Sequence, residues 1–426
     1  MIRNFIEKEK AVFSLFSADA KRLLLVNLIY ALAFPFIIIF GTAFVKRITG
    51  GDNNFAIIYN WGFFAGLVIG YYINGLLLKN KLISIKNLFV VGILLTVIPL
   101  SFLMFFGQGS GYYVIIYGLL VGIGNGIYWS CRNFLSLLVT VNKNRNFFFS
   151  LEQFIIIFCN ALIPLLFGTF VLGNIEDEEF KINAYKYSSL VVVGTNFIAC
   201  WAVLKSNFKS PIISRFVYSK FGSLWNRQRL LTFCVGAVES GFMVLMTLLI
   251  LTVAGDESVL GKIEFYTAII SIISIYIIGR ISKPSHRGRI MLTGAIFLII
   301  GGLVLSVTIN NKMAFYGSIT TSFIGIIIMK VCQVIADPMI HSSYRATLVT
   351  SCENAANLEN RDSYTYIMDN EYFMNGGRIF GGVVFILITT YISSIVALQF
   401  TFIILALIQL ISAFIIKKLN DSSLYN

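Results

Sequence analysis

Three polar residues with helical spacing indicate a binding site for an acidic group. Glu371, Asn375 and Arg378 occupy positions i, i+4 and i+7 of an apolar stretch, so a helix would place them on one face. Glycines flank Arg378 and leave room beside it. A guanidinium there suits bidentate contact with a carboxylate or a phosphate, and Arg378 and Asn375 are substrate-binding candidates. The alternative is a structural ion pair between Arg378 and Glu239 or Glu371.

A second polar stripe occupies another apolar stretch. Its spacings of three and then four residues keep it on one helix face over four turns, and its members are Lys330, Gln333, Asp337, His341 and Arg345. A polar face of this length indicates the wall of a water-filled cavity rather than a surface that faces lipid. We expect Lys330 and Gln333 to contact a substrate. Pro338 should kink or end the helix.

Glu239 is an isolated acid about ten residues inside an apolar stretch, and no basic residue lies within a turn or two of it. An ionisable group in the core of a bilayer is costly unless it is paired or hydrated, so it is a candidate functional residue. We expect Glu239 to bind and release a proton that is coupled to the activity of the protein. Asp369 and Glu371 are further candidates for this proton-coupling role. The alternative is that Glu239 pairs with a base on another helix.

The first half of the chain repeats the pattern with Asn125, Trp129 and Arg132 at i, i+4 and i+7. The substrate-binding candidates in this half are Tyr30, Asn125, Trp129 and Asn160. Two arginines near corresponding helix ends, Arg132 and Arg345, would join the halves as an inner gate, with Glu152 and Asp369 as acidic partners. The gate candidates are Arg132, Arg145, Glu152, Asp337, Arg345 and Arg361.

The composition determines which elements hold these residues. Of the 426 residues, 57% are hydrophobic and only 12% are charged. A membrane-spanning helix needs about 20 residues, so the apolar content is enough for about twelve. These figures exclude a soluble globular enzyme, a disordered chain and a secreted disulfide scaffold. The predicted fold class is an all-α polytopic membrane protein with twelve transmembrane helices.

Apolar stretches divide into two sets of six. The first set covers 21–46, 54–78, 84–107, 111–132, 146–173 and 187–205, and the second covers 229–254, 262–282, 289–310, 313–337, 364–392 and 394–416. The predicted domains are therefore an N-terminal six-helix bundle at 1–205, a basic cytoplasmic linker at 206–228 and a C-terminal six-helix bundle at 229–426. The pattern S-x-R-x-x-L begins at Ser130 and recurs at Ser343, about half a chain length later, as an internal duplication would produce.

Charge sets the expected orientation. The chain carries a net charge of +13, and its basic residues gather in the loops on the side of both termini. The opposite loops hold the acidic run 176–179 and Asp256 and Glu257. The positive-inside rule places both termini in the cytoplasm, for a multi-pass protein of a bacterial inner or plasma membrane. Lys46 and Arg47 lie on the acidic side and break the pattern.

Two duplicated six-helix units joined by a basic loop resemble the major facilitator superfamily of secondary transporters. Arg145 opens the fifth span, and Pro164 and Gly168 form its Pro-x-x-x-Gly element, as is common in that family. The loop from Gly75 to Lys81 keeps the family's glycine and bases but has Lys79 where an aspartate is expected. The resemblance implies two pseudo-symmetric bundles that rock around a central substrate site.

The expected function is secondary active transport by alternating access, coupled to protons, of a small anionic, zwitterionic or amphiphilic solute. The alternatives are a lipid or glycolipid flippase on the same fold and a non-transporting sensor or membrane partner. We expect no enzyme activity, no cofactor, no metal site and no nucleic-acid partner, because nucleotide-binding and hydrolase motifs are missing and only two histidines occur. The expected partners are the solute, protons and the lipid bilayer, and the expected state is a monomer.

Overall fold

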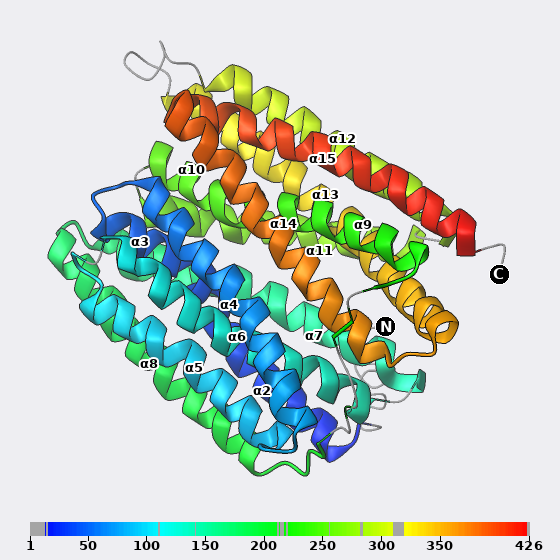
Figure 1. Cartoon of the computed structure of the whole chain (residues 1–426). Coiled ribbons are helices and arrows are strands. Elements are labelled where there is room, and N and C mark those ends of the chain that lie inside the picture. Colours follow the sequence, from blue (N-terminus) through cyan, green and yellow to red (C-terminus); the bar gives the residue numbers. More distant parts are fainter. Residues whose placement is uncertain are drawn as a thin grey trace, which may run out of the picture.

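The computed structural model is a bundle of long helices that run roughly parallel or antiparallel to one another (Figure 1). It describes residues 13, 16–109, 111–140, 142–210, 213, 217–218, 220–254, 256–281, 284–309 and 319–423. Within these ranges it contains helices and no strands, and 12 helical segments are long and apolar enough to cross a membrane. The expected all-α fold class is confirmed.

The first half of the chain forms one group of helices. In order these are α2 (Ala18–Pro35), η1 (Phe36–Phe40), α3 (Gly41–Ile48), α4 (Asn53–Lys79), α5 (Ile85–Phe106), η2 (Gly111–Tyr113), α6 (Val114–Val139), α7 (Asn142–Ile163), η3 (Pro164–Val171), η4 (Leu172–Asn174) and α8 (Glu178–Leu204). Helix α6 packs against α4 and α5, and α2 packs against α7 and α8.

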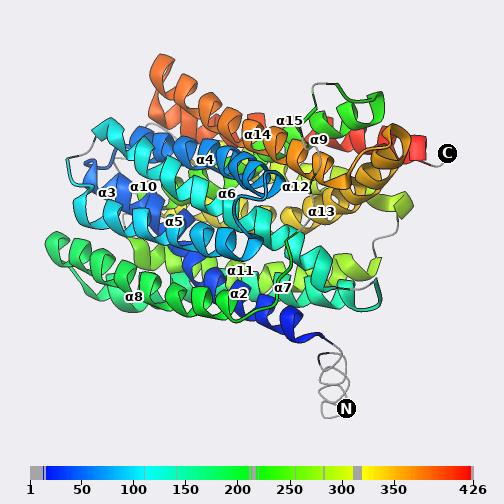
Figure 2. The ribbon, with the colours of Figure 1, turned by 60° about the horizontal axis from the view of Figure 1, so that its bottom comes forward.

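The second half forms the other group. Its elements are α9 (Ser223–Ser240), η5 (Gly241–Leu245), α10 (Met246–Ala254), α11 (Glu257–Ile281), η6 (Pro284–His286), α12 (Arg287–Thr308), α13 (Ile319–Glu359), α14 (Ser363–Tyr391) and α15 (Ser394–Ser423). Helix α9 packs against α14 and α15, and α12 packs against α13 and α15. The start of α2 and the end of α15 lie at the same end of the bundle (Figure 2).

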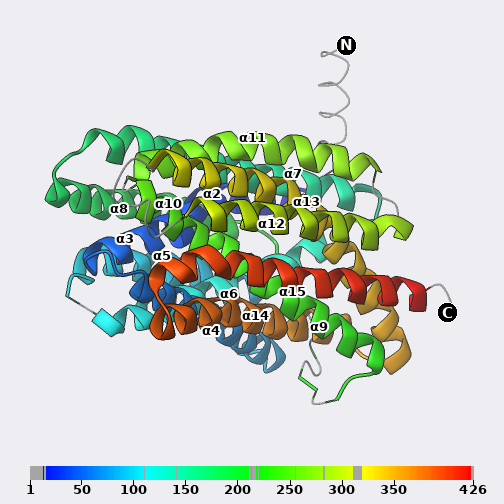
Figure 3. The same ribbon diagram turned by 90° about the horizontal axis from the view of Figure 1, so that it is seen from above.

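The two halves meet along two seams. In one seam α4 lies beside α14, and in the other α11 lies beside α7 and η3 (Figure 3). Helices α3 and α10 also touch across the boundary. A cavity between the halves is lined by parts of α2, η1, α7, η5, α10, α11 and α13.

Three spans change from α-helical to π-helical winding part-way along. In the first span the change follows Pro35, in the fifth span it begins at Pro164, and in the seventh span it begins at Gly241. Proline has no backbone N–H and its ring clashes with the preceding turn, so the regular hydrogen-bond ladder is interrupted there. The wider turn rotates the side chains that follow, and π turns occur often at functional sites.

Helix α13 is longer than the sequence predicted. It has 41 residues, runs through Pro338 without ending, and at about 1.5 Å per residue is roughly twice as long as the hydrocarbon core is thick. The predicted end at residue 337 is therefore wrong. Helix α9 also starts at Ser223, earlier than the predicted 229. The added turns of α9 and α13 belong to a small hydrophobic core, which consists of Trp225, Cys352, Ala355, Ala356 and Tyr366.

Helices α4 and α6 are joined closely through glycines. A Cβ atom on Gly122 would collide with the backbone carbonyl oxygen of Phe63, and one on Gly66 with that of Leu119. Both obstacles are backbone atoms, so a side chain could be accommodated only if the helices moved apart.

Gly122→Ala should therefore destabilise the protein by about 1–3 kcal/mol, the usual range for overpacking. The measurement is the thermal unfolding midpoint of the detergent-purified protein. Gly194→Ala is the matched control, because nothing lies within 4 Å of the added methyl group in helix α8. The control should unfold at the wild-type temperature or slightly above it, and equal losses in the two variants would contradict the packing argument.

Candidate functional site

The structure contains a cavity of about 220 Å³ between the two halves. The wall from the first half is almost entirely apolar and consists of Phe34, Pro35, Ile38, Ile39 and Ile157, with Asn160. The wall from the second half is polar as well as apolar and consists of Phe242, Met243, Thr247, Glu264, Thr267, Ala268, Ser271, Lys330, Gln333, Val334 and Asp337. The charged side chains that line the cavity therefore all come from the second half.

Two interactions organise the polar wall. Lys330 on α13 forms an ion pair with Glu264 on α11, with 2.7 Å between Nζ and Oε1. One turn further along α13, the amide nitrogen of Gln333 donates a hydrogen bond of 3.3 Å to a carboxylate oxygen of Asp337. Within the described ranges Asp337 has no ion pair, so its charge is not neutralised by a base in contact with it.

Local backbone structure directs the side chains to this cavity. The π turns η1 and η5 lie at corresponding positions in the first and seventh spans, and they contribute Ile38, Ile39, Phe242 and Met243 to the walls. On α13 the spacing of Lys330, Gln333 and Asp337 keeps all three on the cavity face.

Arg378 is held by a carboxylate. Its guanidinium donates to both oxygens of Glu239 at 2.9 and 3.0 Å through one terminal nitrogen, and at 3.3 Å through Nε. The other terminal nitrogen donates to Asn375 at 2.8 Å. The guanidinium also lies 5.5 Å from the ring of Phe64 in the first half. The structure thus shows the ion-pair alternative for Arg378 and Glu239, and neither residue lines the 220 Å³ cavity.

The first half has its own buried polar network. Arg132 forms an ion pair with Glu152. Asn27 donates to the same carboxylate, and the hydroxyl of Tyr128 donates to Asn27 at 3.0 Å. Tyr30 stacks on Tyr128, with ring centroids 3.5 Å apart. A small cavity of about 20 Å³, with room for about one water molecule, is lined by Asn27, Tyr30, Tyr128, Trp129 and Glu152 among others.

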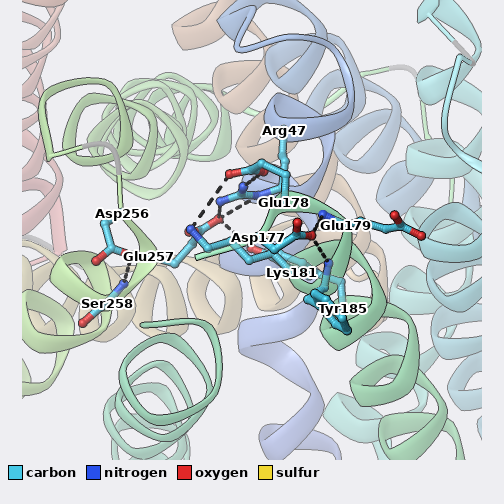
Figure 4. A network of polar contacts seen from close by, with 10 residues as sticks. Arg47, Asp177, Glu178, Glu179, Lys181, Tyr185, Asp256, Glu257 and Ser258 are labelled. Atoms are coloured by element: carbon cyan, nitrogen blue, oxygen red, sulfur yellow. Dashed lines mark hydrogen bonds and ion pairs between the residues drawn. The ribbon is translucent and has the colours of Figure 1, made fainter. Parts of the chain in front are cut away.

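At the end of the bundle with the acidic loops, polar contacts join the halves. Arg47 at the end of α3 pairs with Glu257, the first residue of α11, and with Glu178 of α8, and Tyr185 donates to Glu257 at 3.3 Å (Figure 4). Lys46 donates to the hydroxyl of Thr252 at 2.6 Å. Glu257 is only 2% exposed. The two bases that broke the charge pattern are therefore the ones that bind the second half.

At the opposite end, Asp369 is bound by a base that was not among its expected partners. Arg229 donates to both carboxylate oxygens of Asp369, at 2.6 and 2.7 Å, and the indole of Trp225 donates at 2.6 Å. Arg361 pairs with Glu359 at 2.7 Å and donates to the backbone of Lys220. These contacts lie within the second half and its linker.

In the described contacts, Glu152 and Asp369 each bind an arginine from their own half. Arg132 and Glu152 are both in the first half. Asp369 is bound by Arg229 from its own half, and Arg345 is an exposed residue on the long α13. Sequence spacing singled out these charges, but it contains no information on which helix faces them.

The remaining candidates are dispersed. Lys330, Gln333, Asn160 and Asp337 line the large cavity, although Asp337 was expected at the gate. Asn125 is fully buried, and its amide has no hydrogen-bond partner among the described residues. The other candidates lie elsewhere: Glu371 is partly buried on α14 without an ion pair in the described ranges, and the side chain of Arg145 is outside the described part of the chain.

Sequence reasoning missed Glu264 and the role of Arg47. Glu264, Thr267 and Ser271 follow one another at i, i+3 and i+7, which is the spacing used for the other polar stripes. An arginine among acidic loops is likewise a signal for an ion pair. In the described ranges no three histidines, cysteines or acids come together in a way that could hold a metal ion.

Comparison with solved structures gives the fold. The chain superposes on the POT family transporter PepTSo with a TM-score of 0.71, over 96% of this chain and 98% of that one, at 11% identity. It also superposes on the D-xylose–proton symporter (TM-score 0.64, 12% identity, 93% and 97% covered). The chain has the major facilitator superfamily fold.

Two further comparisons add context to this fold. A bacterial homologue of the human lysosomal transporter Spinster, in an inward-facing and unoccupied conformation, superposes with a TM-score of 0.63 at 11% identity over 96% of this chain and 98% of that one. In sequence, the chain is 25% identical to the uncharacterised protein YqgE of Bacillus subtilis (strain 168) over 361 residues, 82% of this chain and 78% of that protein. No family model matches the sequence.

The ion pair between Glu239 and Arg378 gives a stability prediction. Arg378→Ala leaves the Glu239 carboxylate, midway along the seventh span, without its base. Breaking a fully buried pair costs about 3–5 kcal/mol. The side chains are 17% and 19% exposed, so we expect a loss near 3 kcal/mol, measured as a lower thermal midpoint.

Adding Glu239→Gln to Arg378→Ala removes the unpaired charge and should recover most of the lost stability. If the double variant is as unstable as the single one, the loss comes from missing packing and not from an uncompensated carboxylate.

Proposed function

We propose that this protein is a secondary active transporter that works by alternating access. The observation that supports this most directly is the cavity between the halves, with one wall from each half. In the major facilitator superfamily fold, rocking of one half against the other exposes such a site to the two sides in turn. A cavity whose walls belong to different bodies changes shape when the bodies move.

The described contacts between the halves support a definite conformation. Arg47, Lys46 and Tyr185 tie the first half to Thr252 and Glu257 at the end with the acidic loops. By the positive-inside rule this end is external, and the termini are in the cytoplasm of a plasma membrane. We infer that the structure is closed to the outside and that its cavity opens towards the cytoplasm.

Proton coupling is assigned to the pair of Glu239 and Arg378. Both lie midway along their spans, and the guanidinium contacts both carboxylate oxygens. Protonation of Glu239 would remove one charge of the pair and free Arg378, which also contacts Phe64 across the seam between the halves. A proton could thereby alter how the halves meet. Asp369 is a weaker candidate, because Arg229 and Trp225 bind it far from the cavity.

Alternating access can be tested by distance measurements between spin labels in a variant whose native cysteines are replaced. One pair joins the halves at the acidic-loop end, at Tyr112 and Val307, and another joins them at the opposite end, at Leu82 and Leu358. We expect Arg47→Ala to increase a population in which the first distance is longer and the second is shorter, because it removes an ion pair that closes the outer end.

The matched control is a pair within the first half, at Leu82 and Tyr112, whose distance should not change. A single distribution for every pair, unaffected by Arg47→Ala, would contradict alternating access and favour a static membrane protein.

A further inference from the structure

We propose that the central cavity selects an organic cation: a protonated primary or secondary amine attached to an apolar body. This inference rests on the proposed transport function and names the class of solute. It keeps the amphiphilic option among the solutes expected from the sequence, and it replaces the expected anionic or zwitterionic group, bound by Arg378 and Lys330, with a cation.

The charges that line the cavity do not cancel. Among the described lining residues there are two acids, Glu264 and Asp337, and one base, Lys330. Lys330 is already paired with Glu264 at 2.7 Å, and it is only 5% exposed. Within the described part of the chain, Asp337 has one hydrogen bond, which comes from Gln333. A positive group on the solute would supply the counter-charge that the wall lacks.

Several hydrogen-bond acceptors on the polar wall are free to receive a donor from a ligand. Gln333 uses its amide N–H for Asp337, and its carbonyl oxygen is buried without a partner in the described ranges. The hydroxyls of Thr267 and Thr247 donate to backbone carbonyls of their own helices, at 2.7 and 3.1 Å, so their oxygens can accept from a ligand. An ammonium group is a donor with no acceptor capacity, and it matches such a wall.

The wall from the first half indicates the chemical character of the rest of the solute. Phe34, Pro35, Ile38, Ile39 and Ile157 present hydrocarbon to the cavity, and Asn160 is the polar exception. A solute that reaches across would place its apolar part against the first half and its charged end against the second. An amphiphilic amine does this without leaving a polar group unpaired.

An anion would meet a different situation. Lys330 is engaged by Glu264 and Arg378 by Glu239, so a carboxylate or phosphate would have to compete with an acid that already holds each base. It would also approach the uncompensated charge of Asp337. The pairing of both bases therefore disfavours the anionic class.

The test uses three small molecules of nearly equal shape: phenylbutylamine, phenylbutanol and phenylbutanoate. Their binding to the detergent-purified, full-length protein is measured by isothermal titration calorimetry at neutral pH. We expect the amine to bind at least about tenfold more tightly than the alcohol. The extra free energy of a hydrogen bond to a charged group, compared with a neutral one, corresponds to about that factor in the dissociation constant. The carboxylate should bind more weakly still.

The variants separate charge from packing. Asp337→Asn should weaken amine binding by about tenfold or more, while Asp337→Glu keeps the charge and should keep most of the binding. Glu353→Gln, which removes an exposed acid from the same helix away from the cavity, should leave binding unchanged. Tighter binding of the carboxylate, or amine binding that is unaltered in Asp337→Asn, would overturn the proposal.

The same probes distinguish this proposal from the transport function on which it rests. Amine binding that depends on Asp337, combined with no amine counterflow in proteoliposomes, would support the site and contradict transport. Reciprocal motion of the spin labels without selectivity for the amine would support alternating access and overturn the solute class.

Discussion

The central constraint in this protein is the cost of a charge inside a bilayer. A charged side chain there needs a partner or water, and the structure provides partners for most of its intramembrane charges. Arg378 binds Glu239, Lys330 binds Glu264, and Arg132 binds Glu152. These pairs determine which helices must face one another. They also make Asp337 distinctive, because it lines a cavity without an ion pair in the described ranges.

The pairs fall into two kinds according to the bodies they join. Arg132 with Glu152 and Arg229 with Asp369 act within one half and help to make each half rigid. Arg47 with Glu257 joins one half to the other at the acidic-loop end. Two rigid bodies with a polar closure at one end, and a cavity between them, form an arrangement suited to rocking. A polar closure can reopen at a modest cost because water can replace its partners.

The backbone contributes a second element to the same arrangement. Proline and glycine interrupt the α-helical ladder in the spans that surround the cavity, and the π turns η1 and η5 place large apolar side chains on its walls. Pro338 does not end α13, because the helix continues to Glu359. Neighbouring helices hold its extra turns through a separate small core around Trp225 and Tyr366.

The sequence by itself determined the number of spans, the division into two sets of six, and the helix faces that carry polar residues. These properties follow from apolar length and helical periodicity, which are local. It also identified Lys330, Gln333 and Asp337 as one face. Only the tertiary structure decided the partners: Arg229 for Asp369, and Glu264 for Lys330. Pairing depends on which helices become neighbours and on their rotation, and periodicity within one helix contains no information about either.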